Sequence, residues 1–172
     1  MNFFRKIVTP IGELYIECDL HQVVAVHFSE NDLASCRCAV QPEAADDLLD
    51  EAERQMTAYF VGGLRNFDLP LLGTGSDFQQ LVWNKIAEIP YGAVISYGKI
   101  ALMLGKSGGA RAVGNACNRN PLPIIIPCHR VIGSNGKLTG YRGGIRAKKW
   151  LLELEERQMK NKNTLNLPSF VK

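Results

Sequence analysis

A cysteine, a histidine and an arginine follow one another at Cys128-His129-Arg130, directly after Pro127. The thiolate is the reactive form of cysteine, and nearby cations favour its formation whereas burial opposes it. An imidazole close to a thiol can accept the thiol proton as a general base. Side chains adjacent in sequence need not point the same way. A nucleophilic cysteine and a buried structural cysteine are therefore both open interpretations of this motif.

Two other chemistries compete with a nucleophilic cysteine. A metal site would draw on the N-terminal residues Cys18, His21, His27, Cys36 and Cys38. They include no Cys-x-x-Cys pair, which structural zinc sites commonly use, so we expect no metal. A Cys–His hydrolase would need a group that orients the histidine and donors for an oxyanion, and the sequence specifies neither. The five cysteines are too few and too unevenly spaced for a disulfide framework.

Positive charge is concentrated in the second half of the chain. Residues 1–75 hold 5 basic and 12 acidic residues, whereas residues 76–160 hold 13 basic and 5 acidic residues. The stretch 89–152 contains ten Lys or Arg and no Asp or Glu. This division is typical of two domains of which one binds a polyanion, although a basic face without a partner would give the same count.

The composition is that of a folded globular chain, with 46% apolar and 22% charged residues. No apolar run approaches the roughly 20 residues of a membrane span. The N-terminus lacks the charged-then-apolar order of a signal peptide. We therefore expect a cytoplasmic protein.

The elements that must position the motif begin with a β-rich segment. Phe3–Val8, Glu13–Cys18 and Val23–Phe28 are rich in β-branched and aromatic residues and are predicted to be strands. After Pro42, apolar residues recur at helical spacing until Gly62-Gly63 ends the predicted helix. A link follows at about residues 68–75.

The second half is predicted to be mostly helical. Ser76-Asp77-Phe78-Gln79 fits a capping box, and the helix it opens would bury one face made of Phe78, Leu81, Val82, Ile86 and Ile89. Helices over 97–104 and 110–117, joined by a glycine-rich turn, are typical of a helix-turn-helix. A last helix is expected from about Ile145 to Arg157, followed by a loose tail.

Residues 126–132, Ile-Pro-Cys-His-Arg-Val-Ile, resemble the active-site signature of the O6-alkylguanine-DNA alkyltransferases, the methylated-DNA–protein-cysteine methyltransferases. Further motifs stand at that family's spacings from the cysteine: Ile95-Ser96-Tyr97, Ala110-Arg111-Ala112-Val113-Gly114, Asn120-Pro121, Gly140-Tyr141, and Trp150-Leu151-Leu152 followed by Glu155. The strong match covers about residues 78–155. Thr9-Pro10-Ile11-Gly12 is similar to the family's N-terminal turn, so the resemblance extends to the whole chain.

The resemblance implies a fold and a reaction. An α/β N-terminal domain with a ribonuclease H-like fold, a small antiparallel sheet plus a helix, would cover residues 1–75 with its linker. A mostly α domain with the helix-turn-helix would cover 76–160, and 161–172 would be a flexible tail. The protein would transfer the alkyl group of O6-alkylguanine in DNA, and of O4-alkylthymine, irreversibly and stoichiometrically to its own cysteine. No cofactor is expected.

The resemblance also implies roles for individual residues. Cys128 would attack the alkyl carbon, and His129 would take the thiol proton through a water. Glu155 would hold the histidine, Asn120 would join the DNA-reading helix to the active-site turn, and Tyr97 would donate a proton to the departing guanine. From the residues alone, a solvated charge is the favoured interpretation of Glu155, and Tyr97 can also be interpreted as a core aromatic.

Double-stranded DNA is the implied partner, bound through its minor groove with the damaged base flipped out of the stack. Arg111 would fill the vacated position, and the small residues Ala110, Ala112 and Gly114 would allow a close approach. Phosphate contacts would come from Lys99, Lys106, Arg119 and Lys137. The base pocket would be bounded by Tyr141, Val131 and Arg142. The protein would act as a monomer, with cooperative binding to DNA left open.

Two departures from the family pattern stand out. Gly108-Gly109 occupies a turn where many relatives carry a proline, and Arg142 follows Tyr141 where some relatives have a small residue. The main alternative function is a non-catalytic binder of alkylated bases. Relatives of that kind lack the cysteine, which this chain keeps.

Overall fold

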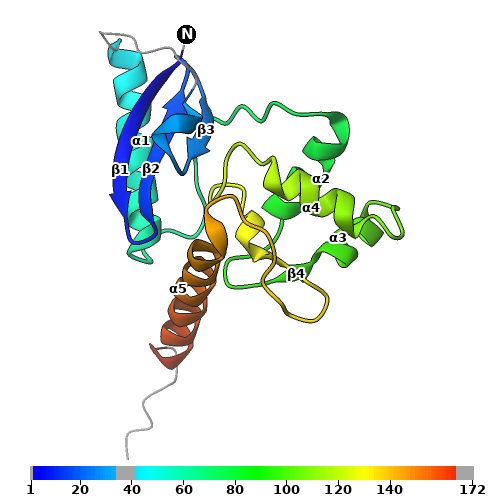
Figure 1. Cartoon of the computed structure of the whole chain (residues 1–172). Coiled ribbons are helices and arrows are strands. Elements are labelled where there is room, and N and C mark those ends of the chain that lie inside the picture. The colour runs from blue at the N-terminus through cyan, green and yellow to red at the C-terminus, as the bar shows by residue number, and fades with distance from the viewer. Residues whose placement is uncertain (1, 34–41, 166–172) are drawn as a thin grey trace, which may run out of the picture.

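The computed structural model describes residues 2–33 and 42–165 (Figure 1). Its first half is a three-stranded antiparallel sheet in the order β1-β2-β3, formed by β1 (Phe3–Thr9), β2 (Gly12–Cys18) and β3 (Val23–His27). The strands predicted from β-branched and aromatic residues are confirmed, with ends that differ by one residue. The turn between β1 and β2 needs Gly12, whose φ is 112°, because L side chains rarely adopt that conformation.

A long helix, α1 (Glu43–Phe60), packs against one face of this sheet (Figure 1). Its buried stripe has the period of an amphipathic helix and consists mainly of Ala45, Leu49, Ala52, Met56 and Tyr59. Tyr59, in its last turn, is buried in the core and donates its hydroxyl to Glu155 in the second half of the chain. The first half therefore supplies a side chain to the region around Cys128.

The second half begins with α2 (Asp77–Ala87), and its predicted capping box is present: the Ser76 hydroxyl accepts from Gln79 N–H, and the Gln79 side chain accepts from Ser76 N–H. The predicted buried face is partly wrong. Leu81 is 54% exposed, whereas Trp83 is buried and donates from Nε1 to the Ala116 carbonyl at 2.9 Å. The reason is angular: positions 82, 83, 86 and 89 share one side of a 3.6-residue helix, and position 81 falls outside it.

The predicted helix-turn-helix is formed by α3 (Tyr97–Met103) and α4 (Ala110–Asn118). Ser96 caps α3 by accepting from Lys99 N–H at 3.1 Å. Residues Ile95 and Ser96 also form β4, which pairs in parallel with β5 (Val131–Ile132). This short ladder holds the start of α3 beside η2 (Cys128–Arg130), so Tyr97 and Cys128 belong to neighbouring segments.

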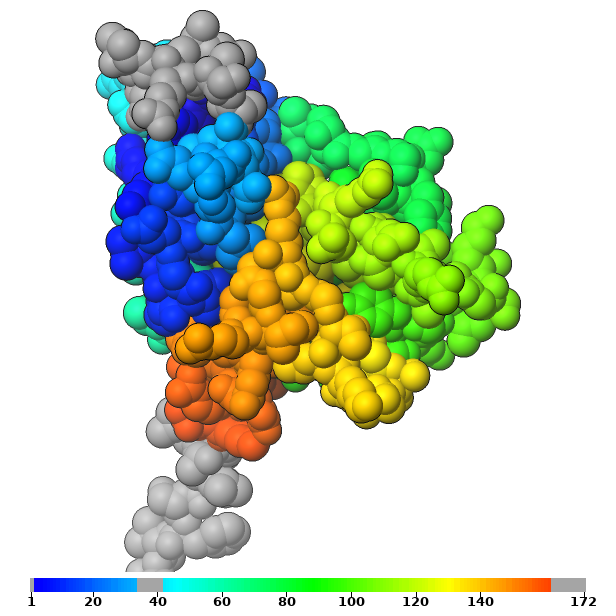
Figure 2. All heavy atoms as spheres, viewed as in Figure 1, coloured from blue at the N-terminus to red at the C-terminus, as the bar shows by residue number. Residues whose placement is uncertain are grey.

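The last helix, α5 (Gly144–Leu165), is longer than predicted. The sequence placed its end at Arg157 and a loose tail from residue 161, but helical backbone continues to Leu165. The helix continues past Arg157 because the next residues, Gln158, Met159 and Lys160, have high helix propensity. The rest of the expected tail, 166–172, lies outside the described residues. In Figure 2 the orange start of this helix and its preceding loop are seated between the blue first half and the green and yellow second half.

The interior contains two apolar clusters. One joins the sheet and α1 to residues of the second half, including Tyr91, Leu122, Ile124, Leu151 and Leu154. The other lies wholly in the second half, among α2, α3, α4 and the turn at Cys128. The first core thus spans both halves, and the domain boundary after residue 75 stays a prediction. Over the described part of the chain, none of the helices combines the length and apolarity that crossing a bilayer requires.

Candidate active site

The turn that carries Cys128 is held by the side chain of Asn120. Its Nδ2 donates to the Ile126 carbonyl at 2.8 Å and to Cys128 Sγ at 3.3 Å, and its Oδ1 accepts from Leu122 N–H at 3.0 Å. Asn120 follows α4 directly, because the helix ends at Asn118 with Arg119 as its C-cap. One amide therefore links the end of the second helix of the helix-turn-helix to the thiol.

Backbone strain accompanies this turn. Ile124 has a φ of 77°, in the left-handed region that a β-branched residue rarely adopts. Its side chain is 1% exposed, so burial in the first core holds it in place. Such strain persists only where surrounding packing fixes the chain, and here it precedes the cysteine by four residues.

Glu155 is the centre of a buried polar cluster next to Cys128. Its Oε1 lies 2.9 Å from His129 Nε2 and accepts from the Tyr59 hydroxyl at 2.7 Å. Arg130 donates from Nη2 to Oε1 at 2.9 Å and from Nε to Oε2 at 3.0 Å, and Gly92 N–H donates to Oε2 at 2.9 Å. Both carboxylate oxygens are thus fully engaged. The solvated-charge interpretation of Glu155 is wrong, because the side chain is 0% exposed.

The charges in this cluster follow from burial and pairing. Burial alone would raise the pKa of Glu155, but the hydrogen bonds from His129 and Arg130, together with the charge of Arg130, outweigh it and hold that pKa at about 2. Burial lowers the pKa of His129, although Glu155 opposes the shift. His129 is therefore neutral at pH 7, with Nε2 facing the carboxylate. Its Nδ1 is buried without a hydrogen-bond partner among the described residues.

Burial also dominates the cysteine. It raises the pKa of Cys128, and the Asn120 hydrogen bond and the charge of Lys148 only partly counteract it. The adjacent Arg130 turns to Glu155 and the Ile89 carbonyl, so it serves the carboxylate rather than the thiol. At neutral pH the resting group is a protonated thiol that needs a base before it can attack.

Tyr97 lies on the other side of the turn. Its hydroxyl donates to the Thr139 carbonyl at 3.0 Å and accepts from Lys148 Nζ at 3.1 Å. Lys148 is buried, and its Nζ also donates to the Thr139 carbonyl at 2.9 Å. Burial lowers the pKa of this ammonium and raises that of the Tyr97 hydroxyl. A tyrosine backed by a buried lysine can deliver a proton to a developing anion.

An open cavity of about 390 Å³ lies between Tyr97 and α4. Arg111, Asn115 and Asn118 line it from the helix, with Thr139 and Gly140 opposite and Ala110 and Gly114 between. Of the residues predicted to meet DNA, Arg111, Ala112, Lys99, Lys106, Arg119 and Lys137 are exposed. The structure thus brings Tyr97, Arg111, Ala110 and Gly114 to one cavity, with the predicted phosphate-binding residues outside it.

The three predicted pocket residues differ in position. Tyr141 stands edge-on to His129, with ring centroids 6.5 Å apart, and its hydroxyl is buried without a partner among the described residues. Val131 is fully buried in the second core. Arg142 extends toward the first half, where its Nη2 lies 3.4 Å from Asp32 Oδ2. Beside it, the Phe28 ring packs edge-to-face on Tyr141 at 5.6 Å.

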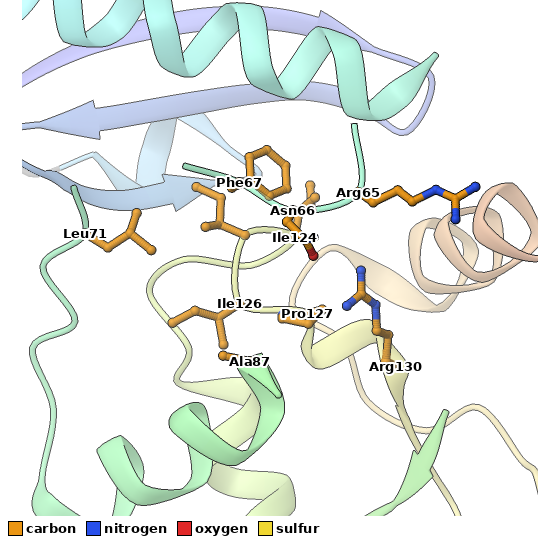
Figure 3. A pocket seen from close by; sticks show the side chains of 10 residues that line it. Arg65, Asn66, Phe67, Leu71, Ala87, Ile124, Ile126, Pro127 and Arg130 are labelled. Carbon is orange, nitrogen blue, oxygen red and sulfur yellow. The ribbon is translucent and has the colours of Figure 1, made fainter. Parts of the chain in front are cut away.

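Behind the turn, a second cavity of about 200 Å³ is bounded by Arg65, Asn66, Pro127 and Arg130, with apolar walls from both halves (Figure 3). The Arg65 and Arg130 guanidinium groups lie 5.4 and 5.5 Å from the Tyr91 ring centroid. Arg130 therefore lines this cavity and also pairs with Glu155.

The sequence did not single out Tyr59, Gly92 or Lys148 as site residues. Tyr59 and Gly92 bond to Glu155 from 96 and 63 positions away, and no local pattern reports such a contact. Lys148 stands in a basic segment and is indistinguishable there from an exposed cation. Among the described residues, no group of three or more His, Cys, Asp or Glu side chains is arranged to hold a metal. Two of the candidate ligands, Cys36 and Cys38, lie outside those residues.

The fold and the site define a class: a thiol protein with a helix-turn-helix, whose cysteine stands beside a buried His–Glu pair. Residues 2–72 match the family described as 6-O-methylguanine DNA methyltransferase, ribonuclease-like domain, and residues 77–157 match its DNA binding domain. The chain belongs to the 6-O-methylguanine DNA methyltransferase family.

Individual relatives cover nearly the whole chain. The methylated-DNA–protein-cysteine methyltransferase of Mycobacterium tuberculosis is 45% identical over 91% of this chain and 93% of its own length. The constitutive enzyme of that name from Bacillus subtilis is 41% identical over 94% of this chain and 100% of its own. The crystal structure of the M. tuberculosis O6-methylguanine methyltransferase gives a TM-score of 0.83 at 44% identity, covering 96% and 99% of the two chains. A structure of the M. tuberculosis protein in complex with DNA gives 0.79 at 45% identity, covering 90% and 93%.

Proposed function

We propose that this protein repairs alkylated DNA by moving the alkyl group from O6 of guanine onto Sγ of Cys128, once per molecule. The observation that carries the proposal is a single buried thiol that accepts from Asn120, next to a histidine paired with a buried carboxylate. A bond forms between Sγ and the alkyl carbon as the carbon–O6 bond breaks, and that bond's electron pair leaves with guanine. The transfer is balanced without a cofactor. Because the thioether product does not release the alkyl group, each molecule reacts only once.

The thiol proton goes to His129. Burial raises the pKa of Cys128, so the sulfur needs a base to become nucleophilic. His129 uses Nε2 to donate to Glu155, which leaves Nδ1 as the nitrogen that accepts the proton through a water. Glu155 then stabilises the imidazolium, and the Asn120 amide stabilises the thiolate.

Tyr97 supplies the proton that guanine needs on departure. A purine anion is a poor leaving group, and a hydroxyl next to a buried ammonium is a suitable donor. To reach the base, the hydroxyl exchanges its bond to Thr139 for one to guanine, while Lys148 keeps its oxygen in position.

DNA reaches this site through the minor groove. Cys128 is 4% exposed, so a base stacked in a duplex has to rotate out before its alkyl group meets the sulfur. Arg111 fills the position the base leaves, and the small residues Ala110, Ala112 and Gly114 let α4 approach closely. Lys99, Lys106, Lys137 and Arg119 bind phosphates, and the same pocket accepts O4-alkylthymine. The chain acts as a monomer.

The test separates binding from chemistry with one substitution. Cys128→Ser keeps the basic face and α4, so it is expected to bind a duplex holding one O6-methylguanine with the parent affinity, measured by fluorescence anisotropy. It is expected to transfer no methyl group, because a serine hydroxyl ionises far less readily than a thiol. Cys117→Ala removes another buried thiol of the same core and serves as the control, with transfer retained. Transfer by the Cys128→Ser protein would refute the proposal.

A further inference from the structure

Three polar side chains form a stripe on α4. Arg111, Asn115 and Asn118 stand at positions i, i+4 and i+7, which places them on one face of the helix. All three are exposed and line the cavity that Tyr97 borders. The function proposed above gives Arg111 a role but gives none to either asparagine.

The two asparagines differ from Asn120, which ends the same segment. Asn120 is 1% exposed and uses both ends of its amide within the protein. Neither Asn115 nor Asn118 has a side-chain hydrogen bond to any residue that the structure describes. Each therefore offers a free donor and a free acceptor to whatever occupies the cavity.

A free amide matches one edge in the minor groove of DNA better than the others. Adenine and thymine present only acceptors there, N3 and O2, whereas guanine presents the N3 acceptor together with the N2 amino donor. An asparagine can donate from Nδ2 to guanine N3 while Oδ1 accepts from the N2 amino group. No other base offers that pair of contacts.

Distance along the helix selects Asn115. With a rise of about 1.5 Å per residue, Asn115 lies about 6 Å from Arg111 along the axis and Asn118 about 10 Å. Successive bases of one strand are about 3.4 Å apart, so 6 Å is just under two base steps and 10 Å is about three. Asn115 therefore faces the first two pairs beyond the vacated position, and Asn118 lies beyond them.

We propose that Asn115 binds the minor-groove edge of guanine in a base pair one or two steps from the lesion, so that repair is faster where such a pair is G·C. The proposal rests on the function proposed above. Through this one side chain, α4 recognises the base sequence around the lesion, in addition to its contacts with the DNA backbone.

The experiment varies only the guanine amino group. Duplexes hold one O6-methylguanine, and each of the two pairs on either side is in turn G·C or inosine·C, which lacks the N2 amino group. A second set uses 2,6-diaminopurine·T and A·T, which restores the same group in another pair. The second-order rate constant of methyl transfer is measured for the parent and for Asn115→Leu, which has similar size and no hydrogen-bonding group.

The parent is expected to react about fivefold faster when the amino group is present at one of these pairs. Asn115→Leu should reduce that ratio to about one, Asn115→Gln should keep part of it, and the matched control Asn118→Leu should keep it whole. Equal ratios for the parent and Asn115→Leu would overturn the proposal, because they would assign any preference to the stiffness of the DNA. Absence of methyl on Cys128 with every duplex would instead overturn the proposed function.

Discussion

The two sides of Cys128 are built in opposite ways. On one side, the carboxylate of Glu155 forms hydrogen bonds with Tyr59, His129 and Arg130. All four side chains are buried, and they come from three distant parts of the chain. On the other side, the face of α4 comes from one nine-residue helix, is exposed, and presents Arg111 and Asn115 without partners from the described residues. The first side is complete before substrate arrives, whereas the second is completed by its partner.

This difference predicts what each side contributes. Removing one member of a buried ion pair leaves an uncompensated charge and costs about 3–5 kcal/mol. Changes on an exposed helix face usually alter stability by no more than about 0.5 kcal/mol. Substitutions around Glu155 should therefore damage both fold and chemistry, and substitutions on α4 should damage the repair of duplex DNA without weakening the fold.

The largest effect is expected from Glu155→Gln. Arg130 would lose its only carboxylate within the described residues and His129 would lose the negative charge on its acceptor, so the free energy of unfolding should fall by about 3–5 kcal/mol. The single-turnover rate should fall at least about a hundredfold, because proton acceptance by His129 loses its support. Urea unfolding and quench-flow transfer assays measure the two losses.

Glu156→Gln is the matched control for that variant. Glu156 is the next residue along α5, is exposed, and forms a bond with Lys160 one turn on. We expect it to change unfolding by less than about 0.5 kcal/mol. If both variants behaved alike, the burial and pairing of Glu155 would contribute nothing beyond what an exposed carboxylate contributes.

Acid should weaken the buried side specifically. The pKa of Glu155 is about 2 in the folded chain against an ordinary 4.5, so the unfolded chain binds more protons between these values. The stability contributed by ionised Glu155 is complete above about pH 4.5 and is lost as the pH falls toward 2, to a total of about 3 kcal/mol. Measured by urea unfolding, the difference between the parent and Glu155→Gln should shrink across this window. A difference that stays constant would contradict the pairing.

On the α4 side, Arg111→Ala should affect duplex repair without affecting stability. If Arg111 fills the vacated stack position, transfer from duplex at saturating protein should fall about tenfold to a hundredfold, whereas transfer from free O6-benzylguanine should be nearly unchanged. Arg119→Ala, at the other end of the helix, should instead weaken binding and lower the salt slope by about one counterion. An equal fall on both substrates for Arg111→Ala would assign that residue to the fold.

The smallest effect is expected where the halves touch through solvent-exposed groups. Arg142 and Asp32 are 33% and 39% exposed in their side chains, so Asp32→Asn should change the free energy of unfolding by less than about 1 kcal/mol. Thermal unfolding in low and high salt measures it. A loss comparable to that of Glu155→Gln would show that this contact, and not the Glu155 cluster, joins the halves.

The same contrast explains what sequence alone could predict. The α4 side is local: a capping signal at Ser96, a glycine-rich turn and small residues are adjacent in the chain, so the helices and Arg111 were predictable. Leu81 and Trp83 flank Val82 on opposite sides of the helix, and it is packing against α4 that selects Trp83 for burial.

The buried side is non-local, and its partners could not be paired in advance. Tyr59 was predictable as a core aromatic but not as a donor to Glu155, because the fold alone brings α1 to α5. Lys148 shows the same limit. Its neighbours Arg146 and Lys149 are exposed, and nothing in the residue pattern distinguishes the one cation that turns inward to Tyr97.

The proposed repair reaction depends most on the fate of Cys128, and intact-mass measurement tests that fate directly. The protein is incubated with excess duplex holding one O6-methylguanine, then weighed and mapped by peptide. We expect one added methyl group per chain, located on Cys128, with Cys18 and Cys117 unmodified and no further transfer. A methyl group on another residue, or more than one lesion repaired per chain, would contradict it.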